Sequence, residues 1–282
     1  MEFNPKNVKT ALVAVLMLSL FSSCSKDDDK APEDKKKGIQ TAANAQFGTI
    51  LTDANGKTLY FFSNDTKGMS TCMGNCLSTW PVYHNNETSS DMKIDKSLLG
   101  EITRADGSKQ STYKGWPLYY YAGDSQSDPV KGDAVNKIWY VAKPDYLLMV
   151  ANAQLVGHDG KNYLGDYTEG TGSTLYLTDD KGRTLYAFSP DKFNKNTFTK
   201  PDFSNDNIWP IYQMDKGALP SLIKSADISV IDVFGKKQLT FKGWPMYYFG
   251  QDQQRGDNKG ISFPRPAVWP ILNDKTTTAP TS

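Results

Sequence analysis

One short segment of the chain concentrates the side chains that bind soft metal ions. It reads Met69-Ser70-Thr71-Cys72-Met73-Gly74-Asn75-Cys76, and His84 follows it closely. Two thiolates with thioether and imidazole ligands would suit copper(I), and the Cys-x-x-x-Cys spacing resembles that of copper-delivery proteins. A disulfide between Cys72 and Cys76 is what we expect in an exported protein, with copper as the alternative. Covalent haem is not indicated, because Cys-x-x-Cys-His is missing from the sequence.

A second pattern places four aspartates at intervals of about 60 residues. Each stands in the motif tyrosine, any residue, an aromatic residue, any two residues, aspartate. The copies are Tyr60-Phe62-Asp65, Tyr119-Tyr121-Asp124, Tyr186-Phe188-Asp191 and Tyr247-Phe249-Asp252.

These carboxylates are candidate catalytic acids or ligands, but paired catalysis would need two of them within about 5 to 10 Å. Each one follows an aromatic stretch and leads into a polar loop. We therefore expect them to cap turns through the backbone. The loops at 124–133 and 252–258 could hold calcium, although neither has the alternating oxygen spacing of a calcium loop.

The motif resembles that of the bacterial secreted-repeat lipoproteins, which are defined by Tyr-x-(Phe/Trp/Tyr)-x-x-Asp. The resemblance extends over residues 46–272 and includes the Cys-x-x-x-Cys that precedes Trp80-Pro81. The family has no established activity, so the resemblance implies no reaction. Some relatives are fused to cytochrome or copper-protein modules, which implies a redox setting for the family.

The chain also repeats itself at a longer period of about 128 residues. Gly56-Lys57-Thr58-Leu59-Tyr60 returns as Gly182-Arg183-Thr184-Leu185-Tyr186, and Lys114-Gly115-Trp116-Pro117 returns as Lys242-Gly243-Trp244-Pro245. All six tryptophans fall into three equivalent pairs. We expect two homologous tandem units, at 39–149 and 150–275, and a disordered tail at 276–282.

The elements that carry these motifs are predicted to be strands. The segments at 58–62 and 184–188 are rich in β-branched and aromatic residues and follow Asp/Asn/Gly turns. Apolar side chains alternate onto both faces, which indicates strands covered on both sides. The fold class we predict is all-β, sandwich- or barrel-like, with short helical turns near 96–99 and 220–225.

The N-terminus has the pattern of an export signal. Lys6 and Lys9 precede an apolar run that ends at Cys24 in a sequence resembling a lipobox. We expect a signal peptide at 1–23, lipid on Cys24 and a charged tether at 24–38. The tether begins with lysine and acidic residues, which resembles the signal of surface-exposed outer-membrane lipoproteins; a periplasm-facing location is the alternative.

Composition narrows the functional classes. The 32 basic and 31 acidic residues balance, so nucleic acid is not an expected partner. With two histidines and no nucleophile or phosphate-loop motif, the sequence does not indicate an enzyme or predict a cofactor. We expect a non-enzymatic β-repeat module that binds an envelope protein or ligand. The alternatives are a redox accessory protein with copper or haem and a glycan-binding surface protein.

Overall fold

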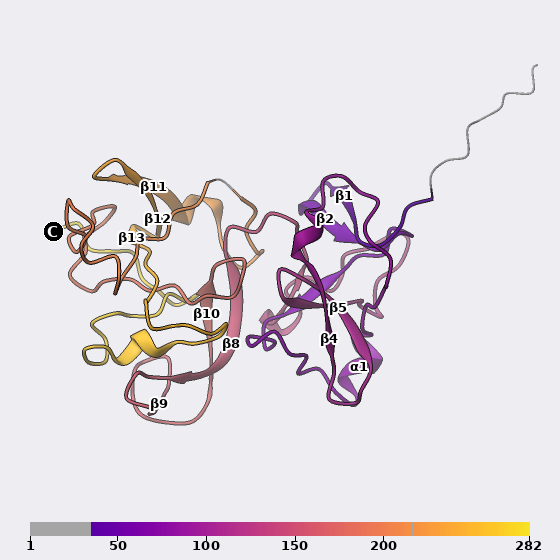
Figure 1. Ribbon diagram of the computed structural model, residues 1–282, viewed down its shortest axis with the longest axis horizontal. Helices are drawn as coiled ribbons and strands as arrows, with labels where there is room; N and C mark the ends of the chain where they lie inside the picture. The colour runs from indigo at the N-terminus through magenta and orange to yellow at the C-terminus, as the bar shows by residue number, and fades with distance from the viewer. Residues whose placement is uncertain (1–34, 216) are drawn as a thin grey trace, which may run out of the picture. The chain divides into compact units, whose positions relative to one another are not determined.

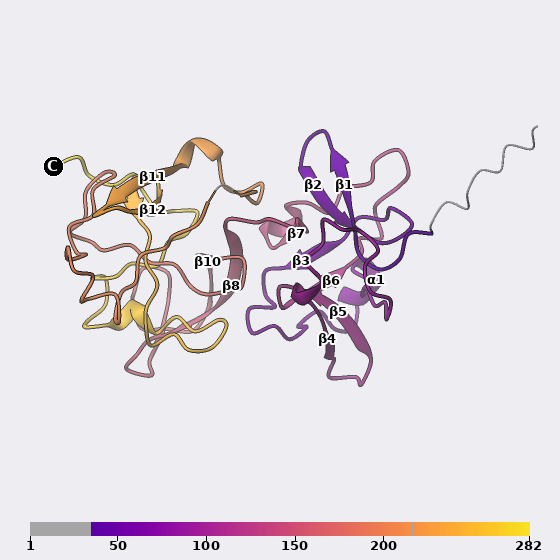
Figure 2. The ribbon, with the colours of Figure 1, turned by 45° about the horizontal axis from the view of Figure 1, so that its top comes forward.

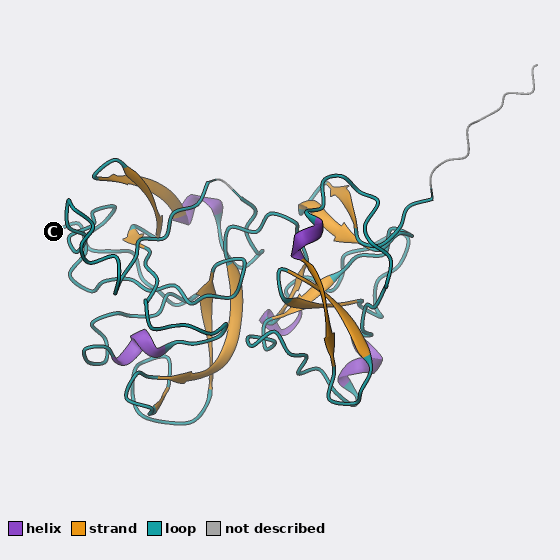
Figure 3. Cartoon of the chain, in the orientation of Figure 1, coloured by secondary structure: helices purple, strands orange, loops and turns teal. Residues whose placement is uncertain are grey.

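In the computed structural model, strands and loops make up nearly all of the chain that is described, residues 35–215 and 217–282 (Figure 3). The expected signal peptide, Cys24 and most of the tether lie outside these residues. Residues 36–282 form one compact unit by their contacts. The all-β prediction is confirmed, but the strand expected at 184–188 is wrong, because this segment pairs only through isolated bridges at Thr184 and Tyr186.

The elements of the first repeat unit are strands β1 to β7 with three short helical segments. In chain order they are β1 (Gln40–Asn44), β2 (Gly48–Thr52), β3 (Tyr60–Phe62), α1 (Cys76–Thr79), η1 (Lys96–Leu98), β4 (Leu99–Thr103), β5 (Lys109–Tyr113), β6 (Trp116–Tyr119), η2 (Val135–Lys137) and β7 (Trp139–Val141).

The second unit runs from β8 to η4 (Figure 1). Its elements are β8 (Met149–Val156), β9 (Asn162–Tyr163), β10 (Ser173–Thr178), η3 (Ser225–Asp227), β11 (Ile228–Val233), β12 (Lys236–Phe241), β13 (Trp244–Pro245) and η4 (Lys259–Ser262). The helical turn expected at 96–99 is confirmed as η1, whereas the one expected at 220–225 falls later, at η3.

Every strand pairing in the described residues is antiparallel, and the sheets are open. The first unit has a hairpin of β1 and β2 and a five-stranded sheet in the order β4-β5-β6-β3-β7 (Figure 2). The second unit has the three-stranded sheets β10-β8-β9 and β11-β12-β13. None of these sheets closes on itself, so the barrel alternative is wrong; the strands are too short and too divided among sheets to form a ring.

The opening hairpins of the two units differ in the loop that joins their strands. In the first unit Gln40 pairs with Thr52, and in the second Met149 pairs with Thr178. Residues 45–47 join the strands in the first unit, but residues 157–172, including β9, join them in the second. The second unit therefore carries an insertion within this hairpin.

Both ends of the folded part differ from the sequence-based expectation. Lys37 N donates to Ser90 Oγ at 3.0 Å, so the fold begins before the expected end of the tether at residue 38. At the other end, Ala279 is buried and its N–H donates to Lys242 O at 3.0 Å. The tail at 276–282 is thus packed rather than disordered, because the second unit supplies partners for its backbone.

Candidate functional site

The four motif tyrosines and aspartates pair crosswise within each unit. Tyr60 and Tyr119 are register partners on adjacent antiparallel strands. Because such a pair is locally two-fold symmetric, each tyrosine reaches the loop that follows the other. Tyr60 Oη donates to Asp124 Oδ2 at 2.8 Å, and Tyr119 Oη donates to Asp65 Oδ2 at 2.7 Å.

The second unit repeats this exchange. Tyr186 and Tyr247 pair across an antiparallel bridge. Tyr186 Oη donates to Asp252 Oδ2 at 2.5 Å, and Tyr247 Oη donates to Asp191 Oδ2 at 2.7 Å. We call each of these four contacts a Tyr–Asp clasp.

The aromatic residue of each motif closes a stack of tryptophans between the clasps. In the first unit Trp80 and Trp139 stack at 3.8 Å between ring centroids, and in the second Trp209 and Trp269 stack at 3.6 Å. The outer faces of these stacks are covered by the remaining motif residues, Phe62 on Trp139 at 4.0 Å, Tyr121 on Trp80 at 4.5 Å, Phe188 on Trp269 at 4.5 Å and Phe249 on Trp209 at 4.5 Å. Every aromatic residue of the motif thereby lies in the core of a unit or packs against it.

Each aspartate also caps its loop, with Oδ1 of its carboxylate as the acceptor. The N–H of Thr71 donates to Asp65 Oδ1 at 2.7 Å, and the N–H of Thr197 donates to Asp191 Oδ1 at 2.7 Å. Asp124 and Asp252 accept in the same way from the N–H groups of Lys131 and Lys259, both at 2.9 Å. The structure therefore has the predicted capping, but the partner tyrosines were not foreseen.

Burial governs the charge of these carboxyls. It raises the pKa of Asp65 to about 6, although hydrogen bonds from Tyr119 and Thr71 oppose the rise. It raises the pKa of Asp252 to about 7, again against a hydrogen bond from its tyrosine. The perturbed groups accept hydrogen bonds from their clasp tyrosines, and Asp65 and Asp191 are fully buried.

The cysteine loop is closed by a disulfide, as expected. Cys72 and Cys76 are bonded with 5.4 Å between their α-carbons, and Cys72 is buried. Arg104 fixes the loop by donating from Nη2 to Cys72 O at 2.7 Å.

The other candidate copper ligands are not gathered around these sulfurs. His84 Nε2 lies 3.0 Å from Glu101 Oε2, while Met69 and Met73 are exposed. Within the described residues, no group of three His, Cys, Asp or Glu side chains is placed to hold a metal ion, which includes the loops at 124–133 and 252–258.

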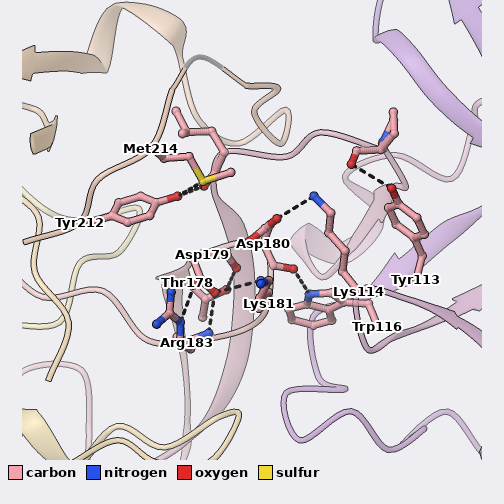
Figure 4. Close-up of polar contacts among 12 residues, drawn as sticks. Tyr113, Lys114, Trp116, Thr178, Asp179, Asp180, Lys181, Arg183, Tyr212 and Met214 are labelled. Atoms are coloured by element: carbon pink, nitrogen blue, oxygen red, sulfur yellow. Dashed lines mark hydrogen bonds and ion pairs between the residues drawn. The ribbon is translucent and has the colours of Figure 1, made fainter. Parts of the chain in front are cut away.

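The two units meet through a face of the first unit centred on Trp116. Trp116 Nε1 donates to Asp180 O at 3.1 Å, and Lys114 Nζ lies 2.6 Å from Asp180 Oδ2 (Figure 4). The guanidinium of Arg255 lies 4.1 Å from the centre of the Trp116 ring. Lys114 and Asp180 are both largely buried, so this ion pair is shielded from solvent.

Apolar packing completes this face. Phe61 lies 5.2 Å from Trp116, 5.7 Å from Tyr140 and 5.8 Å from Tyr146, measured between ring centroids. These aromatic residues belong to the same core cluster as the interior of the second unit. We call the surface of Phe61, Trp116 and Tyr140 the closed face.

The corresponding face of the second unit is open. Its tryptophan, Trp244, is retained, but Ala187 stands in place of Phe61 and Pro270 in place of Tyr140. Two large rings are thus replaced by small side chains, and all three residues line a groove of about 840 Å³. We call this surface the open groove.

The insertion and the C-terminal segment form the walls of the open groove. One wall contains Leu164, Asp166 and Tyr167, and another is formed by residues 272–277. Tyr167 is held at a φ of 67°, a backbone conformation that is strained for a residue with a side chain and that clusters at binding sites. Trp244 Nε1 donates to Thr277 O at 2.9 Å, which ties the C-terminal segment to the rim.

Comparison with known proteins decides the family. Three segments, residues 41–83, 100–143 and 229–272, match a family model described as a secreted repeat of unknown function. These three segments are secreted repeats of this family. No curated protein and no solved structure matched the chain. The repeated pattern Tyr-x-aromatic-x-x-Asp supplies the clasps and covers the tryptophan stacks of these secreted repeats.

The segment that carries the third motif copy, Tyr186 to Asp191, lies between the matched segments of this secreted-repeat protein. It includes Ala187, and the insertion at 157–172 lies in the same gap between matches. The open groove was not predicted from the sequence. A residue-by-residue alignment of the motif copies would have shown the change from Phe61 to Ala187. The number of residues between corresponding positions of the two units is smaller before the insertion than after it, and this difference would have revealed the insertion.

Proposed function

We propose that this secreted-repeat protein is a non-enzymatic binding module of the cell envelope, and that it binds its ligand in the open groove. One observation carries the proposal: the two units share their clasps and tryptophan stacks, but one of them leaves open the face that the other covers. Binding sites are commonly built by loops on a rigid scaffold, and the insertion supplies such a loop.

The motif carboxylates support a binding role over a catalytic one. Each accepts a hydrogen bond from a tyrosine and another from a loop N–H, and the two on the first and third motif copies are fully buried. A carboxylate that transfers protons to a substrate must reach it, and the fully buried Asp65 and Asp191 are enclosed by their own clasps.

An envelope location fits both the family and the start of the sequence. A secreted repeat works outside the cytoplasm, and the chain opens with an export pattern that ends at Cys24. Along the described residues, no helix has the length and apolarity to cross a membrane. Lipid on Cys24 would anchor the protein at the outer membrane, with the folded units exposed at the cell surface.

The anchor is tested by Cys24→Ala. The variant should remain unprocessed by the lipoprotein peptidase and unlipidated, because the acylated thiol is gone. Metabolic labelling with a fatty acid and mass spectrometry of the N-terminus would measure this. Labelling of the variant at the wild-type level would show that the lipid is attached elsewhere.

The binding role is tested by hydrogen exchange of the full chain, with and without an envelope extract. Protection should gather at 173–175 and 273–277, and it should vanish in Ala187→Phe, which fills the open groove with the residue of the closed face. Mass spectrometry of the extract should show no new fragments. Turnover of an extract component that requires one of the motif aspartates would overturn the proposal.

A further inference from the structure

The open groove contains an unpaired sheet edge. Strand β10 is the last strand of its sheet, and Ser173, Thr174 and Leu175 line the groove. Leu177 N donates away from β8, to Leu272 O at 2.8 Å, and Leu177 O accepts from Leu185 N at 3.0 Å. Antiparallel ladders alternate, so the backbone groups of residues two positions away turn to the same side.

The N–H and C=O of Leu175 and Ser173 therefore face the groove. The partner of Leu175 on β8 agrees with this, because Asn152 N also points away from the ladder and donates to Ser63 O at 2.8 Å. The described residues supply no backbone partner to Leu175 on the groove side. An edge of this kind is a template for a further strand.

The closed face shows what kind of ligand this surface accommodates. It is covered by the segment that leads into β8, in which Tyr146 contacts Phe61 and Met149 lines the same small cavity as Phe61 and Trp116. Tyr146 forms a parallel bridge with Ala218, between a turn at Pro144 and Asp145 and a bend at Leu147, and the chain enters β8 at Met149. On the first unit, the occupant is a stretch of polypeptide with large apolar side chains.

Charge in the open groove is balanced. Its rim carries Lys137 and Lys275 together with Asp166 and Asp274. The floor is apolar around Ala187. This lining favours a neutral apolar segment over a phosphorylated or strongly charged one.

We infer that the open groove binds an extended peptide segment of a partner protein, which adds as a strand to the edge of β10 and places alternate apolar side chains over Ala187 beside Trp244. This inference rests on the proposed binding role and names its ligand class. Main-chain hydrogen bonds to Ser173 and Leu175 would supply affinity. The space over Ala187 and Pro270, which stand where the closed face has Phe61 and Tyr140, would select large apolar residues.

The test uses as its probe the segment of this chain that covers the closed face. A fluorescent peptide of residues 143–150 is titrated into the full chain in detergent and followed by anisotropy, with a scrambled peptide as reference. The peptide should bind, and Ala187→Phe should weaken it at least tenfold. Ala122→Phe is the matched control, since Ala122 is exposed on the first unit and outside the groove.

A second arm needs no protein variant. Peptides methylated on alternate backbone nitrogens should fall into two classes, because a strand presents every second N–H to its neighbour. One class should bind at least tenfold more weakly and the other should bind normally. Equal binding of both classes would overturn strand addition.

A third arm separates the ligand class from the groove itself. If neutral oligosaccharides bind in a manner sensitive to Ala187→Phe and the peptide does not, the peptide inference is wrong while the groove remains the binding site. The proposed function fails as well if Ala187→Phe leaves the binding of both probes unchanged and also leaves unchanged the hydrogen-exchange protection that the envelope extract produces.

Discussion

In the first unit, Phe61 lies against Trp116 and is covered by Tyr146 from the segment that enters the second unit. In the second unit, Ala187 occupies the position of Phe61, and Trp244 borders an open groove. The clasps and tryptophan stacks are the same in both. The comparison teaches that the repeated residues build the same scaffold in both units, and that the open groove arises where the two copies diverge.

Substitutions in the tryptophan stacks should have the largest effect on stability, and the effect should be similar in the two units. Trp139→Ala and Trp269→Ala each remove a buried ring that contacts a second indole and a motif aromatic. Each should lower the free energy of unfolding by about 3 to 5 kcal/mol. Denaturant unfolding measures this, and a loss in only one unit would break the equivalence of the two scaffolds.

The buried carboxyls should make stability depend on pH. Burial raises the pKa of Asp65 from 3.8 to about 6 in the folded protein, so the folded state holds this proton more tightly than the unfolded state. The corresponding stabilisation is present below about pH 4 and is lost as pH rises through about 6. Each unit of pKa shift corresponds to about 1.4 kcal/mol, so the free energy of unfolding should fall by on the order of 3 kcal/mol over this pH range.

Asp65→Asn isolates this contribution, because the amide cannot ionise. The difference in unfolding free energy between wild type and variant should change between pH 4 and 7 in favour of the variant. Asp252→Asn should show the same dependence in the second unit about one pH unit higher, because burial raises the pKa of Asp252, the equivalent of Asp124, to about 7. A difference that does not vary with pH would mean that the native carboxyl is not perturbed.

The clasps should differ in strength according to their burial. Tyr119→Phe and Tyr247→Phe leave oxygens of the fully buried Asp65 and Asp191 without a donor, and each should cost about 1 to 3 kcal/mol. Tyr60→Phe should cost less, because Asp124 is partly exposed and water can replace the hydroxyl. Thermal unfolding ranks them, and an equal loss for all three would contradict the role of burial.

The disulfide should have the smallest effect, and of the two units only the first contains one. A loop of this size removes little entropy from the unfolded chain, on the order of 2 kcal/mol or less in the chain-entropy model. The double variant Cys72→Ala, Cys76→Ala should therefore fold, with a melting temperature a few degrees lower. The second unit manages with Phe198 at this position, packed 4.7 Å from Trp269. Failure of the double variant to fold would show that the two loops are not equivalent.

The parts of this molecule that could be predicted from the sequence depend on residue types and spacings within short segments. A turn followed by a β-branched and aromatic run predicted strand β3, whereas the similar run at 184–188 forms only isolated bridges at Thr184 and Tyr186. The spacing of Cys72 and Cys76 predicted their bond. The crosswise clasps were not foreseen because they depend on which strands pair. Tyr60 and Asp124 are brought together only by the pairing of β3 with β6.

The open groove was missed for a different reason. Its decisive residue is an alanine, which carries no chemical signature of its own, and its meaning comes from the phenylalanine at the same position in the other unit. The disordered tail was wrong because composition cannot show that the second unit holds Ala279 and its neighbours.

Amide exchange at Leu175, followed by NMR or mass spectrometry with and without the 143–150 peptide, tests the central claim most directly. Thr49 is its counterpart on the β2 edge of the first unit, where the hairpin register is the same, and serves as the internal control. We predict that Leu175 exchanges rapidly in the free protein, that Leu177 is protected by its bond to Leu272 O, and that the peptide slows Leu175 but not Thr49. Leu175 already protected without peptide, or both edges slowed alike, would contradict the account.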